Sequence, residues 1–241
     1  DKYGTQRVIM WIRQATEAGG FYRPADKAWI SLERVQFLGA CNPPTDSGRY
    51  PLSDRFLRHA PVILVDYPGP DSLRQIYGTF NRAMLKMQPQ LDRSLAEAMT
   101  RTMVRFYRDS QKQFTVDSQP HYLYSPRELT RWKTAIYEAI RDTTGLTETQ
   151  LIRLCIHEAM RIFSDRLVYA EEQKWSEDRI NDIVIDEFQC GEDAVKRPIL
   201  FSTYLANNYQ EADREELREH VRSKLRIFYE EELSVHLVIF D

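Results

Sequence analysis

The pattern of hydrophobic and polar positions changes character near residue 70. Before that point, short apolar runs alternate with glycine and proline, and after it apolar residues recur every three or four positions. Short apolar runs bounded by turn residues are typical of buried strands, and the longer repeat is that of an α-helix. The pattern therefore predicts an α/β segment followed by a helical one.

The α/β segment is predicted to contain two helices, a hairpin and two strands. Gly19-Gly20 ends a predicted helix over residues 3–18, because glycine accepts the left-handed conformation that terminates helices. Continuous apolar runs predict strands that are buried on both faces. These strands cover residues 35–41 and 61–67, the hairpin joins residues 21–23 to 29–32, and the second helix covers residues 52–58.

The later segment is predicted to be a series of helices. Asp71 or Ser72 caps the first, which reaches about Met87, and Ser125-Pro126 places an N-cap residue before a proline in the first helical position of the third. Asp213-x-x-Glu216 is a capping-box spacing that begins a long amphipathic helix. The second helix is marked by Met99, Met103, Phe106 and Phe114, and the fourth by Leu151, Cys155, Ala159 and Ile162. The long amphipathic helix turns Leu217, Val221, Leu225 and Phe228 inward. A short fifth helix over residues 176–188 and a strand over residues 235–240 complete the prediction.

These elements predict an α/β plus all-α protein that is mostly helical overall. We expect three parts: an α/β part at residues 1–70, a small helical domain at residues 71–190, and a connector at residues 191–241. The chain has 241 residues, which is enough for one or two domains with a real core.

Composition excludes several classes of function. The net charge of −3, with 29% charged residues, gives no basic footprint for nucleic acid. No run of 18 apolar residues predicts a membrane span, and the opening DKYGTQRV has no signal-peptide pattern. We therefore expect neither nucleic acid nor a membrane as a partner.

The cysteines and histidines do not form a metal-binding pattern. The three cysteines are widely spaced and odd in number, which favours buried thiols in a reducing compartment over a disulfide framework. The five histidines show no HxxxH spacing, and no CxxC pair is present. We expect no metal site within the chain.

The stretch GACNPPTDSGR, residues 39–49, places one amide side chain at the end of a predicted buried strand. Asn42 can donate and accept hydrogen bonds there without adding charge. Asparagine before two prolines also caps turns. The residues alone leave both interpretations open.

Five long contiguous runs together span nearly the whole chain. They are DKYGTQRVIMWIRQ, GGFYRPADKAWISLERVQFLGACNPPTDSGR, PLSDRFLRHAPVILVDYPGPDSLRQIYGTFNRAM, QPHYLYSPRELTRW and FYEEELSVHLVIFD. These runs resemble the dynein heavy chain family, and specifically the third AAA+ unit of its motor ring in the cytoplasmic form. The resemblance implies a partial AAA+ nucleotide-binding α/β core followed by a helical lid, with residues 191–241 as a connector and the start of the next AAA+ unit.

The resemblance also implies roles for individual residues. Asn42 matches sensor 1, near the γ-phosphate and the attacking water, and Arg55 matches an arginine finger that reaches the nucleotide of the preceding unit. Arg127 matches sensor 2, which contacts this unit's own nucleotide. Arg58 and Arg131 are second candidates. A guanidinium group suits the arginine roles because it is permanently charged and can donate two parallel hydrogen bonds to phosphate oxygens.

The residues alone also allow structural interpretations of the arginines. Arg55 can lie on a solvated helix face, where a cation near the C-terminus is favourable. Arg127 can be a surface arginine, although a cation in the first turn of a helix is mildly unfavourable. We expect Glu128 to serve the cap of that helix.

The chain lacks the parts that hold triphosphate and magnesium. No GxxxxGK[ST] sequence occurs, and no strand ends in paired acids. The resemblance implies that ATP or ADP with Mg²⁺ binds the intact heavy chain, and that this fragment binds no cofactor and hydrolyses no ATP alone. In the family, the third unit regulates microtubule release driven by the first.

The resemblance further implies a cytoplasmic, cytoskeletal protein. Its partners are the neighbouring AAA+ units of the same heavy chain, a second heavy chain and the accessory chains, with microtubules reached only through a distant stalk. A helical scaffold or adaptor without a nucleotide role remains the alternative function.

Overall fold

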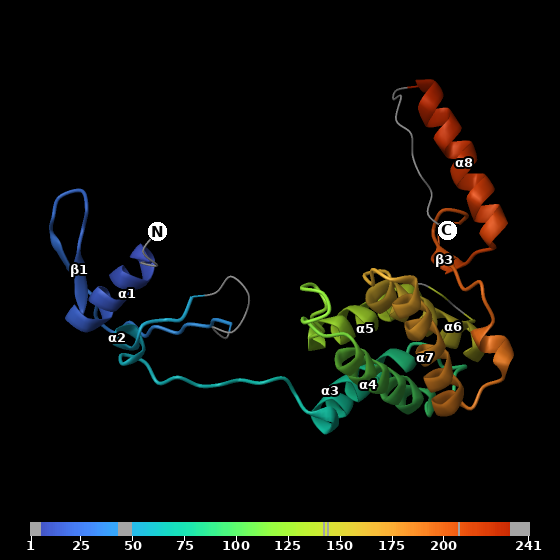
Figure 1. The fold of residues 1–241 in the computed structure, drawn as a ribbon, viewed down its shortest axis with the longest axis horizontal. Helices are drawn as coiled ribbons and strands as arrows, with labels where there is room; N and C mark the ends of the chain where they lie inside the picture. The colour runs from blue at the N-terminus through green and yellow to red at the C-terminus, as the bar shows by residue number, and fades with distance from the viewer. Residues whose placement is uncertain (1–5, 43–49, 142, 144, 207, 232–241) are drawn as a thin grey trace. The chain divides into compact units, whose positions relative to one another are not determined.

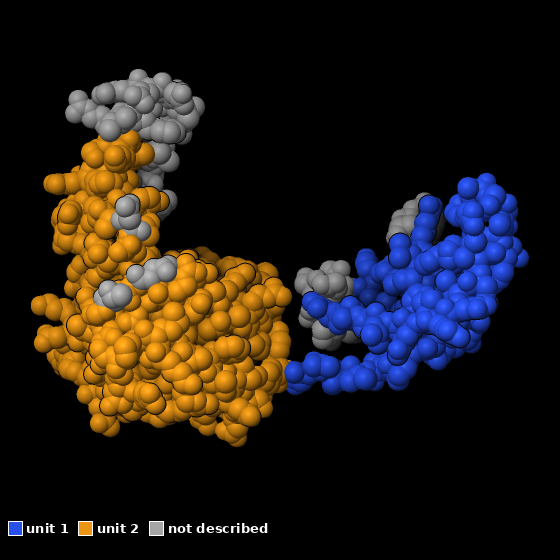
Figure 2. Space-filling model, turned by 180° about the vertical axis from the view of Figure 1, so that it is seen from behind, with its two compact units in different colours: residues 1–66 blue, residues 67–241 orange. Residues whose placement is uncertain are grey.

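The chain forms two compact units, residues 1–66 and residues 67–241 (Figures 1 and 2). The computed structural model describes residues 6–42, 50–141, 143, 145–206 and 208–231, with side chains up to Leu225. Unit 1 contains two helices and a hairpin, and unit 2 carries the helical core.

Unit 1 confirms the predicted first helix and hairpin. Helix α1 (Arg7–Ala18) ends at Gly19, whose φ of 64° is the left-handed conformation that glycine adopts without strain. Strands β1 (Gly20–Tyr22) and β2 (Trp29–Ser31) pair antiparallel. A side chain at Gly20 would place its Cβ 2.4 Å from the carbonyl oxygen of Ile30, so the hairpin needs glycine there.

The two predicted buried strands are wrong. Residues 35–41 and 61–67 form no strand, and their side chains lie in solvent: Leu38 is 91% exposed and Leu64 is 86% exposed. A strand with two buried faces needs neighbours on its edges to satisfy its backbone. Among the described residues of unit 1, only β1 and β2 pair, so neither stretch has such a neighbour.

Unit 2 confirms the predicted helices. The apolar repeat sets their buried faces, and Met99, Met103 and Phe106 lie in the core as expected. Two short antiparallel strands also pair between residues 201 and 211. The elements are α2 (Asp54–Leu57) in unit 1, and α3 (Pro70–Leu85), α4 (Leu95–Gln113), α5 (Pro126–Arg141), α6 (Glu148–Ala159), η1 (Met160–Ser164), α7 (Ala170–Phe188), η2 (Glu192–Val195), β3 (Phe201–Ser202), β4 (Gln210–Glu211) and α8 (Arg214–Glu231) in unit 2.

An aromatic cluster forms the centre of the unit 2 core. Trp132 of α5 meets Phe106 of α4 and Phe163 of η1, with ring centroids 6.1 Å and 5.7 Å away in edge-to-face geometry. The indole Nε1 of Trp132 donates a hydrogen bond of 3.0 Å to the carbonyl oxygen of Cys155 in α6. One side chain therefore joins four helical elements.

Parts of unit 2 differ from the sequence prediction. Helix α7 begins six residues earlier than expected, because the Glu172 carboxylate accepts a 3.3 Å hydrogen bond from the Tyr169 amide and caps its start. Leu217, Val221 and Leu225 of α8 are only half-buried. The Phe228 side chain and the predicted strand over 235–240 lie outside the described residues. No helix within the described ranges is long and apolar enough to cross a membrane.

The contrast between the two units predicts unequal amide hydrogen exchange. The backbone N–H groups of Val62–Val65 have no partner in the described part of the chain, whereas the amides of Leu151–Ala159 lie in a buried helix. We expect the first stretch to exchange at close to the rate of an unfolded chain and the second to be strongly protected. Exchange measured by mass spectrometry on the monomeric 241-residue chain tests this, and equal, strong protection of both stretches would contradict it.

Candidate functional site

The predicted arginines of unit 1 lie on and beside the short helix α2. Arg55 is exposed, and its side chain has no hydrogen bond or ion pair among the described residues. Arg58 follows at the C-cap and forms an ion pair with Glu17 of α1, while its Nε donates a 3.2 Å hydrogen bond to His59 Nε2. Arg58 therefore anchors α2 to α1, and Arg55 is the guanidinium free to meet an anion.

The start of α5 presents the other predicted arginines. Arg127 and Arg131 lie one turn apart, both are exposed, and neither side chain has a partner in the described ranges. Ser125 caps the helix, with its Oγ accepting a 3.3 Å bond from the Arg127 amide. The Glu128 carboxylate accepts 2.7 Å and 2.9 Å bonds from the Ser125 amide and hydroxyl, which confirms its expected capping role.

Two further contacts fix the start of α5 in place. The Tyr77 hydroxyl of α3 donates a 2.7 Å hydrogen bond to the Pro126 carbonyl and lies 2.9 Å from the Thr130 hydroxyl. Burial raises the pKa of Tyr77, so this hydroxyl stays protonated at neutral pH. Arg166 forms a 3.5 Å ion pair with Glu128 from another direction. Arg127 therefore stands on a rigid helix start.

Asn42 lies at the edge of the described structure. Its side chain is exposed, and no partner for it is found among the described residues. The turn expected after it, residues 43–49, lies outside the described ranges. Within unit 1, no described contact joins Asn42 to Arg55 or Arg58.

The cysteines divide into buried and accessible thiols. Cys155 is buried, which raises the pKa of its thiol to about 12 and keeps it unreactive. The expectation of buried thiols is wrong for Cys41, which is exposed, because the strand predicted to bury it does not form. No cluster of three or more His, Cys, Asp or Glu side chains suited to a metal occurs among the described residues.

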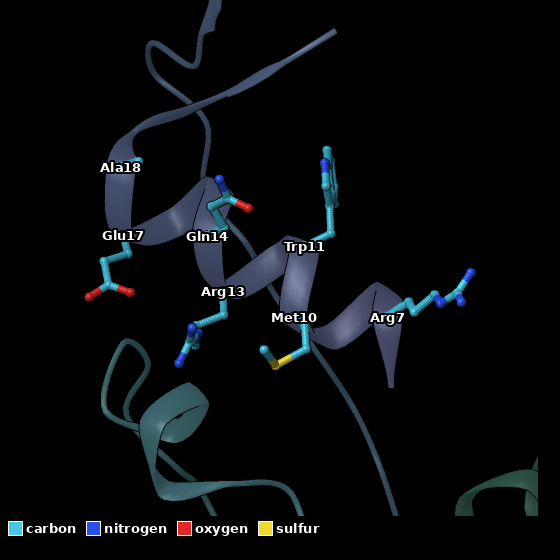
Figure 3. Close-up of a pocket in the computed structure, with 7 residues that line it drawn as sticks. All are labelled: Arg7, Met10, Trp11, Arg13, Gln14, Glu17 and Ala18. Carbon is cyan, nitrogen blue, oxygen red and sulfur yellow. The ribbon is translucent and has the colours of Figure 1, made fainter. Parts of the chain in front are cut away.

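A cavity of about 480 Å³ lies along α1, and all seven residues that line it belong to that helix (Figure 3). Trp11 points away from Met10 and Arg13 in this view. None of the predicted site residues lines the cavity. A single helix offers no converging polar groups of the kind that ligand sites have.

A partly buried polar network that the sequence did not indicate joins α6 to residues 192–211 of the connector. Arg153 donates hydrogen bonds of 2.8 Å to the Lys196 carbonyl, 2.9 Å to the Pro198 carbonyl and 2.7 Å to Glu211. Its side chain is only 14% exposed. Charge-assisted bonds to backbone oxygens are strong, so Arg153 holds the connector on the helical core.

Two neighbouring side chains of α6 extend this network. Glu158 is buried and accepts a 2.7 Å hydrogen bond from the Tyr209 hydroxyl, and it also forms a 2.8 Å ion pair with Arg161. The Nδ1 atom of His157 lies 3.3 Å from the carbonyl oxygen of Ile199, which assigns the ring proton to Nδ1. Burial lowers the pKa of His157, and the nearby carboxylates of Glu158 and Asp165 partly oppose this effect.

Comparison with known proteins assigns the chain to a family. Residues 80–173 match the model of the dynein heavy chain ATPase lid domain, and residues 1–68 match the P-loop containing dynein motor region. The chain belongs to the dynein heavy chain family. The lid match lies within the helical core of unit 2, from α3 into the start of α7.

Relatives among the dynein heavy chains match along the whole chain. The cytoplasmic dynein heavy chain of Dictyostelium discoideum is 55% identical over 242 residues, that of Drosophila melanogaster is 57% identical over 244, and that of Caenorhabditis elegans is 56% identical over 245. Each alignment covers 100% of this chain and 5% of the relative. The chain therefore spans about a twentieth of the length of these dynein relatives.

The half-buried imidazole of His157 predicts a pH-dependent stability. Because the folded state lowers the pKa of His157, the unfolded state takes up a proton first as the pH falls, and the free energy of unfolding decreases. We expect the wild type to lose more stability than His157→Gln between about pH 7.5 and about pH 5.5. Denaturant unfolding followed by helical circular dichroism measures this difference.

His220→Gln on α8 is the matched control for this experiment, because the half-buried His220 side chain has no hydrogen bond or ion pair to the connector strands or to α6 among the described residues. Its stability should follow the wild-type pH dependence. Identical pH dependences of the wild type and His157→Gln would contradict the assignment.

Proposed function

We propose that this chain is part of the third AAA+ unit of a cytoplasmic dynein motor ring. It supplies the later half of the large α/β domain, the small helical lid, and the start of the fourth unit. The observation that carries the proposal is the identity of 55–57% with cytoplasmic dynein heavy chains, sustained over the full length of the chain. In this role the unit binds nucleotide and regulates ATP-driven movement along microtubules.

Three residues take the nucleotide roles in this proposal. Asn42 orients the attacking water as sensor 1, Arg55 reaches the nucleotide of the preceding unit, and Arg127 reaches the nucleotide of its own unit. The exposed, unpartnered guanidinium groups of Arg55 and Arg127 support these assignments, since neither is used within the described structure. Arg58 is the weaker candidate because Glu17 already binds it.

The residues present fit only the outer contacts of a magnesium nucleotide. Exposed guanidinium groups suit phosphate oxygens, but the sequence has no P-loop lysine and the described residues have no acidic cluster for Mg²⁺. In this proposal the phosphate cradle and the magnesium ligands come from elsewhere in the heavy chain. The 241-residue chain alone then hydrolyses no ATP.

The proposed partners follow from the same assignment. They are the neighbouring AAA+ units of the heavy chain, a second heavy chain and the dynein accessory chains, with microtubules reached through the distant stalk. We place the parent protein in the cytoplasm, on the cytoskeleton. Relatives that carry the word cytoplasmic in their names support this location.

The sensor role of Asn42 predicts a selective kinetic defect. In the intact motor, Asn42→Ala should slow hydrolysis at this unit on the order of a hundredfold while nucleotide affinity stays the same, because the amide acts on the transition state. Single-turnover hydrolysis and equilibrium nucleotide binding at this unit measure the two effects. Unchanged turnover would rule out the sensor role.

The two arginines predict defects at different sites. In the intact motor, Arg55→Ala should slow turnover at the preceding unit on the order of a thousandfold, whereas Arg127→Ala should weaken or slow only this unit. Site-resolved nucleotide binding and turnover separate these outcomes. Lys86→Ala, which removes an exposed cation from the end of α3, is the control and should change neither site.

The same experiment separates the motor function from the scaffold alternative. Normal coupling in both arginine variants, together with lost binding of a partner protein, would favour a scaffold. Defects of both variants at the same site would show that one arginine is assigned to the wrong unit.

A further inference from the structure

One face of α4 carries a row of cations. Arg101, Arg105, Arg108 and Lys112 recur at intervals of four, three and four residues, so they lie on the same side of the helix. The row extends for about 16 Å, given the rise of 1.5 Å per residue. A hollow of about 140 Å³ lies along it, and Arg74 of α3 borders the hollow. We refer to the four α4 side chains as the α4 basic row.

The acidic side chains in the hollow are already bound. Glu187 of α7 is 16% exposed, and it accepts hydrogen bonds of 2.6 Å from Arg101 Nε and 3.2 Å from Arg105 Nη1. Asp109 accepts bonds of 3.0 Å and 2.6 Å from Arg179. These carboxylates fix the guanidinium groups of the arginines that bind them. Because both carboxylates are paired, little free negative charge remains in the hollow.

The α4 basic row keeps donors that nothing in the described structure uses. Arg108 and Lys112 are exposed, and neither side chain has a partner among the described residues. Arg101 binds Glu187 through Nε alone, so both of its terminal nitrogens remain available. The row therefore combines fixed guanidinium groups with two free cations.

We propose that the α4 basic row binds an acidic peptide segment of a partner protein. Carboxylates on one side of the peptide would bind the free cations and the remaining guanidinium donors, a geometry that arginine favours. This surface is independent of the nucleotide roles proposed above. Its occupant comes from outside the heavy chain.

The size and charge of the hollow favour a peptide over other anions. Its volume of about 140 Å³ admits a carboxylate head, whereas sites for larger organic ligands measure roughly 300–1,000 Å³. The continuous phosphate backbone of a nucleic acid would meet Asp186, whose side chain is 65% exposed beside Arg105. A peptide can space its carboxylates to avoid that side chain.

Fluorescence anisotropy on the 241-residue chain tests the proposal. The probe is a labelled 12-residue peptide with glutamate at every third or fourth position. We expect saturable binding that weakens with salt, because exposed charges are screened. The double variant Arg108→Glu, Lys112→Glu should weaken binding by about tenfold or more, because the new carboxylates repel the glutamates of the peptide.

Arg93→Glu is the matched control, because it makes the same exchange at an exposed arginine before α4 and outside the row. It should bind the peptide as the wild type does. Helical circular dichroism checks that all variants stay folded. Equal loss in the control, no effect of the double variant, or tighter binding of inorganic phosphate or an oligonucleotide would overturn the proposal.

The intact heavy chain tests whether the occupant is an outside partner. An acylating reagent should modify Lys112 in the parent motor, and the acidic peptide should protect it. If Lys112 is already protected without peptide, another part of the heavy chain covers the α4 basic row and the proposed occupant is wrong.

Discussion

A helix satisfies its backbone hydrogen bonds internally, whereas a strand depends on neighbours, and this difference separates the two units. In unit 2, the helices from α3 to α7 bury their main apolar faces against one another. In unit 1, the run from Val62 to Val65 has the composition of a buried strand but lies in solvent, with Ile63 80% exposed. Adjoining strands would cover its apolar side chains and pair with its free backbone groups. The match of residues 1–68 to the dynein motor region covers this run and the exposed apolar run of residues 35–41.

The aromatic centre of the lid also determines where the candidate arginine stands. Trp132 packs edge-to-face on Phe106 and Phe163, and contacts of this kind contribute about 0.5–1.5 kcal/mol each beyond the area they bury. The indole hydrogen bond to Cys155 sets the rotation of α5 about its own axis. Because Arg127 lies five residues before Trp132 on that helix, this rotation decides which way the arginine faces. The solvent-facing position of Arg127 therefore follows from the packing of the core.

Local signals made most of the fold predictable, and long-range contacts account for the errors. The caps at Gly19 and Ser125 and the apolar repeats of α4 and α6 are complete within a few residues of sequence. The strand predictions failed because an apolar run indicates only that its side chains favour burial. A strand also needs a neighbouring strand, and the run itself does not show whether one is present. Arg153 gave no signal at all, since its acceptors are mainly backbone carbonyls more than 40 residues away. The proposed sensor role of Asn42 rests on the family resemblance, because an amide at the end of an apolar run also caps turns.

The same long-range contacts give the lid a mechanical link to the segment that follows it. Arg153 binds carbonyls at two points of the connector and the carboxylate of Glu211, which lies three residues before α8 begins. Glu158 holds Tyr209, and His157 holds Ile199, from adjacent positions of α6. A shift of α6 relative to the connector would break several exposed or partly buried hydrogen bonds together, and it would take the Tyr209 hydroxyl away from the buried Glu158 carboxylate. A buried polar group left unpaired costs about 1–3 kcal/mol. Moving the connector with α6 breaks none of these hydrogen bonds. The bonds that stabilise the lid thus also make α6 and the approach to α8 one rigid piece.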